Sequence, residues 1–117
     1  MDSKLVQLLV KEIRLFFSRA KKKKAVLGLS GGIDSALCAV LLVKALGKKN
    51  VSALLLPFEG ISSEQNQSDA KNLSKKLGIA RFTVKINEFA EQYSGLPWKQ
   101  PDAAKANLLA RVRATVL

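Results

Sequence analysis

The chain has 117 residues, of which 48% are hydrophobic and 25% charged, and this is the composition of a globular protein rather than of a disordered or fibrous one. At this length we expect one domain over residues 1–117, with little room for a second core. Twenty lysines and arginines against nine aspartates and glutamates give a net charge of +11. That excess points to anionic partners: phosphorylated small molecules, nucleic acid or an acidic membrane face.

The residue types that are missing narrow the chemistry further. The sequence contains no histidine, which excludes imidazole catalysis and histidine-ligated zinc within these 117 residues. Its single cysteine, Cys38, lies in an apolar run, so there is no disulfide framework. No apolar stretch approaches the roughly 20 residues needed to cross a bilayer. We therefore expect a cytoplasmic protein with no membrane partner.

The hydrophobic pattern alternates between helical spacing and short apolar runs. In chain order it predicts a helix over Lys4–Phe17, a strand over Ala25–Leu29, a helix over Ser35–Leu46, a strand over Val51–Leu56, a helix ending near Leu77, a strand over Arg81–Ile86, a short helix over Asn87–Tyr93 and a helix from Ala103 onward.

This order predicts a Rossmann-like α/β fold, with a parallel sheet, right-handed crossovers and helices on both faces. The all-apolar first strand is expected to be central, and the partly polar third strand is expected to lie at an edge. The basic run Arg19–Lys24 is typical of a solvated helix end. The last residues, 111–117, continue a helical pattern without a stop signal. We therefore expect a domain truncated after three strands, the amino-terminal part of a longer protein.

The segment that carries chemistry is Gly28–Ser35, between the first strand and the helix that follows. Its glycine pair, Gly31 and Gly32, permits backbone conformations closed to other residues and lets N–H groups approach a ligand. The hydroxyls of Ser30 and Ser35 add donors, and the positive end of the helix dipole favours an anion. The loop lacks the lysine of a Walker A motif, and its glycine spacing does not fit the G-x-G-x-x-G fingerprint. The combination predicts a different kind of phosphate-binding loop.

Asp34 is the unexpected member of this loop. A carboxylate beside bound phosphates repels them unless a cation lies between, and Mg²⁺ takes one or two carboxylates together with phosphate oxygens. The competing interpretation is structural: the two glycines form a tight turn, and Asp34 or Ser35 merely caps the helix.

The segment Ser30–Ser35, with the sequence Ser-Gly-Gly-Ile-Asp-Ser after a first strand, resembles the signature of the PP-loop ATP pyrophosphatases. These enzymes cleave ATP between its α and β phosphates to adenylate a substrate. Within that superfamily the chain is similar to the NAD synthetase family over essentially its whole length. The segments that match in order are the helix before the first strand, Leu56-Pro57, Ser62-Ser63, Asp69-Ala70, Leu77-Gly78-Ile79 and Asn107–Arg113. One departure is Ala106, where the family has glycine.

The resemblance implies an ATP-dependent amidation of deamido-NAD to NAD through an adenylated intermediate, with release of AMP and pyrophosphate. It implies a homodimer and the substrates ATP, deamido-NAD and ammonia, and it assigns no catalytic side chain in this segment. The family continues past Leu117, so we expect weak or no amidation from residues 1–117 alone. The implied site residues are Gly28, Leu29, Ser30, Gly31, Gly32, Ile33, Asp34 and Ser35 for ATP, Asp34 for Mg²⁺ and Arg111 for deamido-NAD.

Other interpretations remain open. Another PP-loop adenylating enzyme, such as a tRNA-modifying enzyme, would use the charge of +11 to hold RNA. No aromatic-interleaved basic stretch accompanies that charge, so nucleic acid is not expected as a partner. A non-catalytic nucleotide-binding remnant would keep the fold alone. For Arg111, the alternative to a substrate contact is a solvated arginine on a helix surface.

Overall fold

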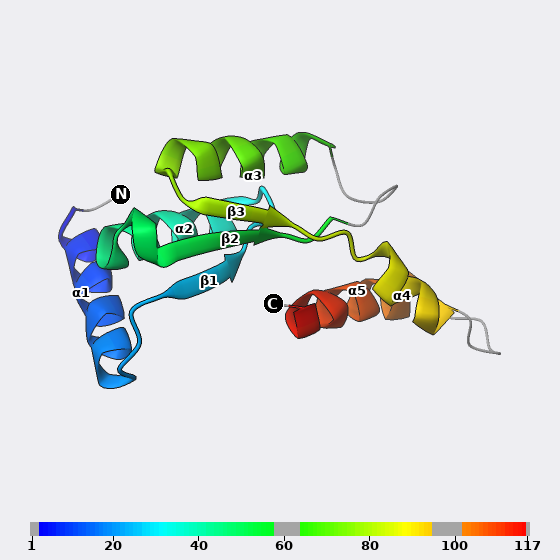
Figure 1. The fold of residues 1–117 in the computed structure, drawn as a ribbon, viewed down its shortest axis with the longest axis horizontal. Helices are drawn as coiled ribbons and strands as arrows, with labels where there is room; N and C mark the ends of the chain where they lie inside the picture. The colour runs from blue at the N-terminus through cyan, green and yellow to red at the C-terminus, as the bar shows by residue number, and fades with distance from the viewer. Residues whose placement is uncertain (1–2, 58–63, 95–101, 117) are drawn as a thin grey trace.

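The computed structural model describes residues 3–57, 64–94 and 102–116 (Figure 1). The positions Ser62 and Ser63, which the resemblance singled out, lie outside these ranges. The elements are α1 (Ser3–Arg19), β1 (Ala25–Gly28), α2 (Ile33–Leu46), η1 (Lys48–Asn50), β2 (Val51–Leu55), α3 (Glu64–Leu77), β3 (Ala80–Thr83), α4 (Asn87–Ser94) and α5 (Asp102–Val116).

The three strands form one parallel sheet in the order β1-β2-β3, as the alternating pattern predicted (Figure 1). The expectation that the first strand is central is wrong for the strands that the structure describes, because β2 lies between the other two. The apolar residues of β1 meet different surroundings: Leu27 is buried, whereas Val26 is 58% exposed. The third strand lies at an edge, as predicted, and all four of its residues are exposed.

Helices pack on both faces of the sheet. One face buries Leu27, Ala53 and Leu55 against Ala39 of α2 and Ala70 of α3, while α1 packs on α2. Side chains on a strand alternate between faces, so the opposite face receives the even-numbered residues of β2. There α5 packs through Leu108, Leu109, Val112 and Val116 against Leu54, Leu56, Val84 and Ile86. Each face therefore has its own apolar cluster.

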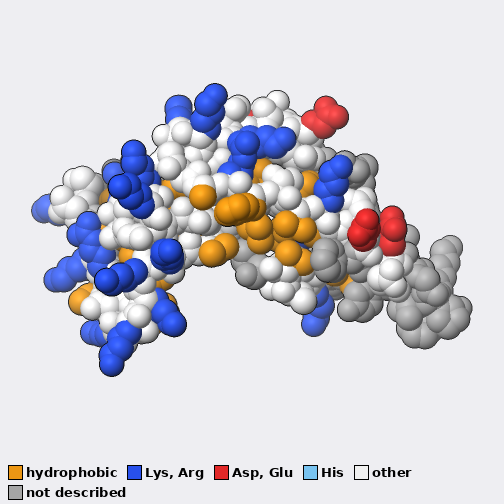
Figure 2. All heavy atoms as spheres, in the orientation of Figure 1, with side chains coloured by type: hydrophobic (Ala, Val, Ile, Leu, Met, Phe, Trp, Pro, Cys, Tyr) orange, Lys and Arg blue, Asp and Glu red, His pale blue; other side chains and the backbone are white. Residues whose placement is uncertain are grey.

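The second face is covered mainly toward the carboxyl ends of its strands. Its amino half leaves Val26 at 58% and Phe82 at 59% exposed. Figure 2 looks onto this face and shows hydrophobic side chains at the surface between the sheet and the α5 region. In the described part of the chain, no helix is long and apolar enough to cross a membrane.

Backbone hydrogen bonds extend the ladder beyond the strand ends. The N–H of Leu29 donates to the Leu54 carbonyl at 3.0 Å, and the N–H of Val84 donates to the Leu55 carbonyl at 2.8 Å. Helix α2 begins at Ile33, two residues earlier than predicted, because Gly32 is its N-cap. Asp34 therefore belongs to the first turn of α2, at the carboxyl edge of the sheet.

Candidate nucleotide-binding site

The Gly28–Ser35 segment, which we call the serine-glycine loop, lies at the carboxyl edge of the sheet. Leu29 anchors its start, since that residue is only 3% exposed and bonds to β2. The chain then turns at Gly31, whose φ is +87°, and enters α2. Ligands of parallel α/β proteins bind beyond the carboxyl ends of the strands, and the loop lies in that position.

Two serine hydroxyls hold the loop in shape. The Ser35 hydroxyl accepts a hydrogen bond from the N–H of Ser30 at 3.2 Å and donates to the carbonyl of Gly32 at 3.2 Å. It also lies 3.0 Å from the Ser30 hydroxyl, which in turn accepts from the N–H of Gly32 at 3.2 Å. The serines that the sequence singled out are thus brought together, and Ser35 links both ends of the turn.

Gly31 packs against the first turn of α3. A β-carbon added at Gly31 would overlap the backbone carbonyl of Asn66, so the position requires glycine for space as well as for its positive φ. Sequence reasoning missed Asn66. Its only sequence signal is its place near the start of the helix after the second strand, which brings it to the same edge of the sheet as the loop.

The amino terminus of α2 has no side-chain cap. Its N-cap is Gly32, which has no side chain to cap with, and no side chain of the described residues accepts a hydrogen bond from the N–H groups of Ile33, Asp34 or Ser35. The hydroxyl of Ser35 points back into the loop, and Asp34 lies two residues past the N-cap, inside the first turn. The structure therefore does not form the capping arrangement that competed with ligand binding. Uncapped N–H groups at the positive end of a helix favour an anion.

The carboxylate of Asp34 is exposed in the first turn of α2, beside Ile33, which is 84% exposed. It forms no hydrogen bond or ion pair with another described residue. The described residues contain no group of three side chains able to hold a metal ion by themselves. A single carboxylate instead suits a magnesium ion that takes its other ligands from phosphate oxygens and water. The residues present therefore fit an ion that arrives with a nucleotide.

The two arginines of α5 occupy different environments. Arg111 is exposed, and its side chain forms no hydrogen bond or ion pair with another described residue. Arg113 is half-buried, and its Nε donates to the carbonyl of Leu56 at 3.0 Å, just beyond the end of β2. Sequence reasoning chose Arg111 and missed Arg113. The helical period held a signal, because Arg113 follows Leu109 by four residues and so borders the apolar face of α5.

This difference leads to a prediction about stability. Arg113→Met should lower the free energy of unfolding by about 1.5–3 kcal/mol, because it removes a charged donor from the Leu56 carbonyl and loosens α5 from the sheet. Arg111→Met changes the same residue type two positions away and should change the unfolding free energy by less than about 0.5 kcal/mol. Urea unfolding of both variants checks this. Equal losses in the two variants would contradict the anchoring role of Arg113.

Nucleotide-binding α/β proteins hold phosphates at the start of a helix that follows the first strand of a parallel sheet through a glycine turn. The serine-glycine loop and the uncapped start of α2 have this arrangement. Comparison with known families agrees with this class. The family model described as NAD synthase matches residues 5–117, so the chain belongs to the NAD synthase family.

Similar proteins support the assignment over the same range. The chain is 37% identical to the NH₃-dependent NAD⁺ synthetase of Archaeoglobus fulgidus over 110 residues, which are 94% of this chain and 44% of that protein. It superposes with a TM-score of 0.91 and 34% identity on the NH₃-dependent NAD synthetase of Campylobacter jejuni, covering 100% of this chain and 51% of the other. The NMN synthetase of Francisella tularensis gives 0.88 and 34%, covering 97% and 47%. The chain thus spans about half the length of these relatives.

Proposed function

We propose that this chain is the ATP-binding part of an NAD synthetase, an enzyme that amidates deamido-NAD to NAD through an adenylated intermediate. The observation that carries the proposal is the uncapped start of α2 beside the loop held by Ser30 and Ser35. Membership of the NAD synthase family supports the choice of reaction. The name of the Archaeoglobus fulgidus relative supports ammonia as the nitrogen donor, while a 35% identical relative from Thermotoga maritima is named glutamine-dependent, so free ammonia and ammonia from glutamine are both sources to test.

In the proposed reaction a carboxylate oxygen of the nicotinate ring substituent attacks the α-phosphorus of ATP. The bond from that phosphorus to the oxygen bridging the β phosphate breaks, and pyrophosphate leaves. Ammonia then attacks the acyl carbon, AMP leaves, and the nitrogen loses a proton to solvent. The serine-glycine loop and the positive end of α2 would bind the pyrophosphate moiety and stabilise the negative charge that grows on it. No described side chain needs to act as a general base in these steps.

The remaining site assignments belong to the same proposal. ATP would contact Gly28–Ser35, and Arg111, whose exposed side chain forms no hydrogen bond or ion pair with a described residue, would contact deamido-NAD. Mg²⁺ would be held by Asp34 and would supply charge neutralisation between that carboxylate and the phosphates. We also propose that the protein is a cytoplasmic homodimer and that residues 1–117 form part of a single domain.

The test is isotope exchange. The protein is incubated with ATP, Mg²⁺, deamido-NAD and labelled pyrophosphate, because reversal of adenylation moves the label into ATP. We expect exchange only when deamido-NAD is present. When ammonium is added, we expect AMP and NAD to form as products. Since the chain spans about half of its relatives, we expect slow exchange from residues 1–117 alone, with ATP binding retained. ADP as product would overturn the proposal.

Parallel reactions separate the rival substrates. Deamido-NAD is replaced by nicotinate mononucleotide, by bulk tRNA or by no acceptor, at equal ATP and Mg²⁺. Exchange with tRNA but not with either nicotinate nucleotide would favour the tRNA-modifying alternative. Binding of ATP without exchange under any condition would favour a non-catalytic module. Faster exchange with nicotinate mononucleotide would support the adenylation chemistry but would replace deamido-NAD by the mononucleotide as the proposed substrate.

A further inference from the structure

The edge of the sheet opposite the serine-glycine loop carries a concentration of positive charge. In a parallel α/β sheet each crossover helix ends where the next strand begins, so the carboxyl ends of α1, α2 and α3 gather at the amino edge of the sheet. Ten cations lie in these helix ends and in the turns that follow them. This amino-edge strip consists of Arg19, Lys21, Lys22, Lys23, Lys24, Lys44, Lys48, Lys49, Lys75 and Lys76.

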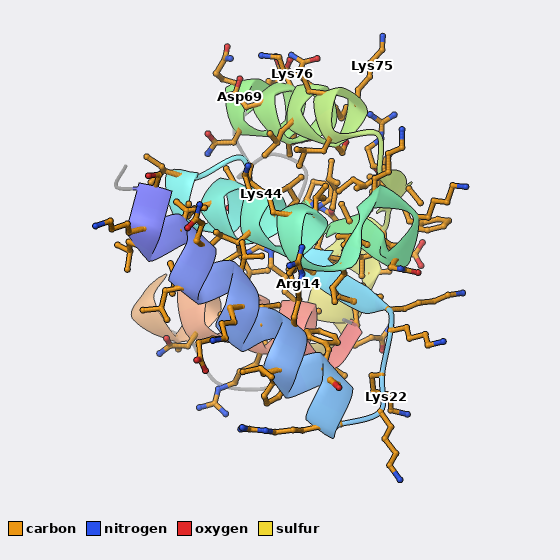
Figure 3. All side chains as sticks on the ribbon, turned by 90° about the vertical axis from the view of Figure 1, so that its left-hand side faces the viewer. Arg14, Lys22, Lys44, Asp69, Lys75 and Lys76 are labelled. Carbon is orange, nitrogen blue, oxygen red and sulfur yellow. The ribbon has the colours of Figure 1, made fainter. Side chains whose placement is uncertain are left out.

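The figures show how widely these side chains spread. Figure 3 looks onto the amino edge, with Lys22 at the bottom, Lys44 near the middle and Lys75 and Lys76 at the top. Figure 2 shows most of its lysines and arginines over the left half and the top of the molecule and fewer toward the right, where the acidic side chains lie. The strip crosses the edge instead of surrounding one point. That distribution fits a polymeric anion better than a single phosphate.

The strip has no neutralising carboxylates among the described residues. None of its side chains forms an ion pair with a described acid. Clustered like charges destabilise a folded protein through self-repulsion, and an anionic partner removes that cost. The acids whose side chains the structure describes lie on α1, at the starts of α2 and α3, farther along α3 and on α4; they are Glu12, Asp34, Glu64, Asp69, Glu88 and Glu91.

Capping of the helix ends does not account for these lysines. The last turn of α2 is met by Arg14, which donates to two of its carbonyl groups at 3.0 and 3.1 Å. Backbone hydrogen bonds close α1 over residues 20–22, and the N–H of Gly78 bonds to the carbonyl of Lys75 at 3.2 Å at the end of α3. At the three helix ends, Arg14 and backbone N–H groups therefore donate these hydrogen bonds to the carbonyl groups, and no side chain of the strip does. The side chains of the strip remain available for a ligand.

We propose that the amino-edge strip binds the phosphate backbone of a nucleic acid duplex. Nine of its ten cations are lysines, compact point charges that suit phosphate contacts. The segments that form the strip contain no large exposed hydrophobic side chain; Phe16, 68% exposed, lies one turn before Arg19, so binding to phosphatidylserine vesicles is measured beside duplex binding. The strip's segments 19–24, 44–49 and 75–76 also lack aromatic residues, which favours backbone contact over base stacking.

This proposal departs from the sequence expectation, which found no aromatic-interleaved basic stretch and so no nucleic acid partner. The sequence does not show that three separate basic segments meet at one edge; the topology does. The strip lies at the opposite edge of the sheet from the serine-glycine loop. The proposal is therefore independent of the proposed amidation.

The experiment compares two variants of equal net charge by fluorescence anisotropy with a labelled RNA duplex of about 25 base pairs at about 0.1 M salt. Each variant replaces three exposed lysines by glutamine, one set inside the strip and the other outside it. Thermal unfolding of both variants checks that they fold as the unmodified chain does. The strip variant is Lys23→Gln/Lys48→Gln/Lys75→Gln, and the control is Lys4→Gln/Lys11→Gln/Lys71→Gln.

We expect the strip variant to lose about tenfold or more in affinity and to lower the slope of log K against log salt by about 2 to 3, since each phosphate contact contributes about 0.9. The control should change affinity by less than about threefold. Equal losses in both variants would overturn the proposal, because net charge alone would then explain binding. Tighter binding of a single strand of the same length, or strip-dependent binding to phosphatidylserine vesicles without duplex binding, would overturn it as well.

Discussion

Replacing Gly31 by alanine should lower the affinity for ATP by about a hundredfold or more, close to complete loss in a titration. Two physical causes act together. The φ of +87° at Gly31 costs any residue with a β-carbon about 1–3 kcal/mol, and the added methyl group would overlap the carbonyl of Asn66. The backbone must move to relieve that overlap. Such a movement displaces the N–H of Gly32 and the hydrogen bonds of Ser30.

Gly47→Ala is the matched control. Gly47 has the same φ of +87°, but a β-carbon there meets nothing within 4 Å. It should destabilise the fold by about 1–3 kcal/mol through backbone strain while leaving ATP affinity unchanged. Calorimetric titration with ATP and Mg²⁺, together with urea unfolding, measures both quantities. If Gly31→Ala binds ATP as well as Gly47→Ala does, the contact between the loop and α3 has no part in the site.

Asp34→Asn should invert the effect of magnesium on ATP binding. With Mg²⁺ present, the variant should bind ATP about tenfold more weakly than the unmodified chain, because the ion loses its carboxylate ligand. Without Mg²⁺, the variant should bind ATP more tightly than the unmodified chain, because a negative charge that repels the phosphates is gone. The two affinity changes have opposite signs. A capping residue would produce no such crossover, since capping does not depend on a metal ion.

The control for this experiment is Asp69→Asn. Asp69 is an exposed carboxylate on α3 whose Oδ1 accepts a hydrogen bond from Gln65 at 2.8 Å, and its replacement removes the same unit of charge. ATP affinity in this variant should stay within about twofold of the unmodified chain in both buffers. A crossover in Asp69→Asn as well would show that general electrostatics, and not a metal ligand, governs the response to Mg²⁺.

The fold was largely predictable because its signals are local. Apolar periods located the helices and strands, and glycines marked two helix ends, where Gly47 and Gly78 have φ values of +87° and +71°. The strand order was less accessible. The apolar pattern predicts that both faces of β1 are covered, but it does not say what covers them, and Val26 lies on a face that the described residues leave largely open.

The site was predictable in its residue types but not in its contacts. The pairing of Ser30 with Ser35 follows from a short loop that enters a helix, so local sequence held the information. The packing of Gly31 against Asn66 joins residues 35 positions apart, and no local pattern encodes it. The different environments of Arg111 and Arg113 depend on which side of α5 faces the sheet, a matter of helical phase that a motif match ignores.

We therefore propose two sites that attract phosphate: the serine-glycine loop at the carboxyl edge and the amino-edge strip at the opposite edge. Their electrostatics differ. The loop supplies oriented N–H groups and one carboxylate, whereas the strip supplies many mobile point charges without a carboxylate. Nucleotide binding at the loop should depend on Mg²⁺, and adventitious binding of a triphosphate to the strip should weaken steeply with salt.

The central claim is that the serine-glycine loop holds the phosphates of ATP. A titration of ¹⁵N-labelled protein with ATP and Mg²⁺, followed by amide chemical shifts at physiological salt, tests it residue by residue. We expect the largest shift changes in the amides of Gly28–Ser35, with those of Lys44–Lys49 nearly unchanged. Saturable shift changes confined to the amino-edge strip, with the amides of Gly28–Ser35 unmoved, would contradict it.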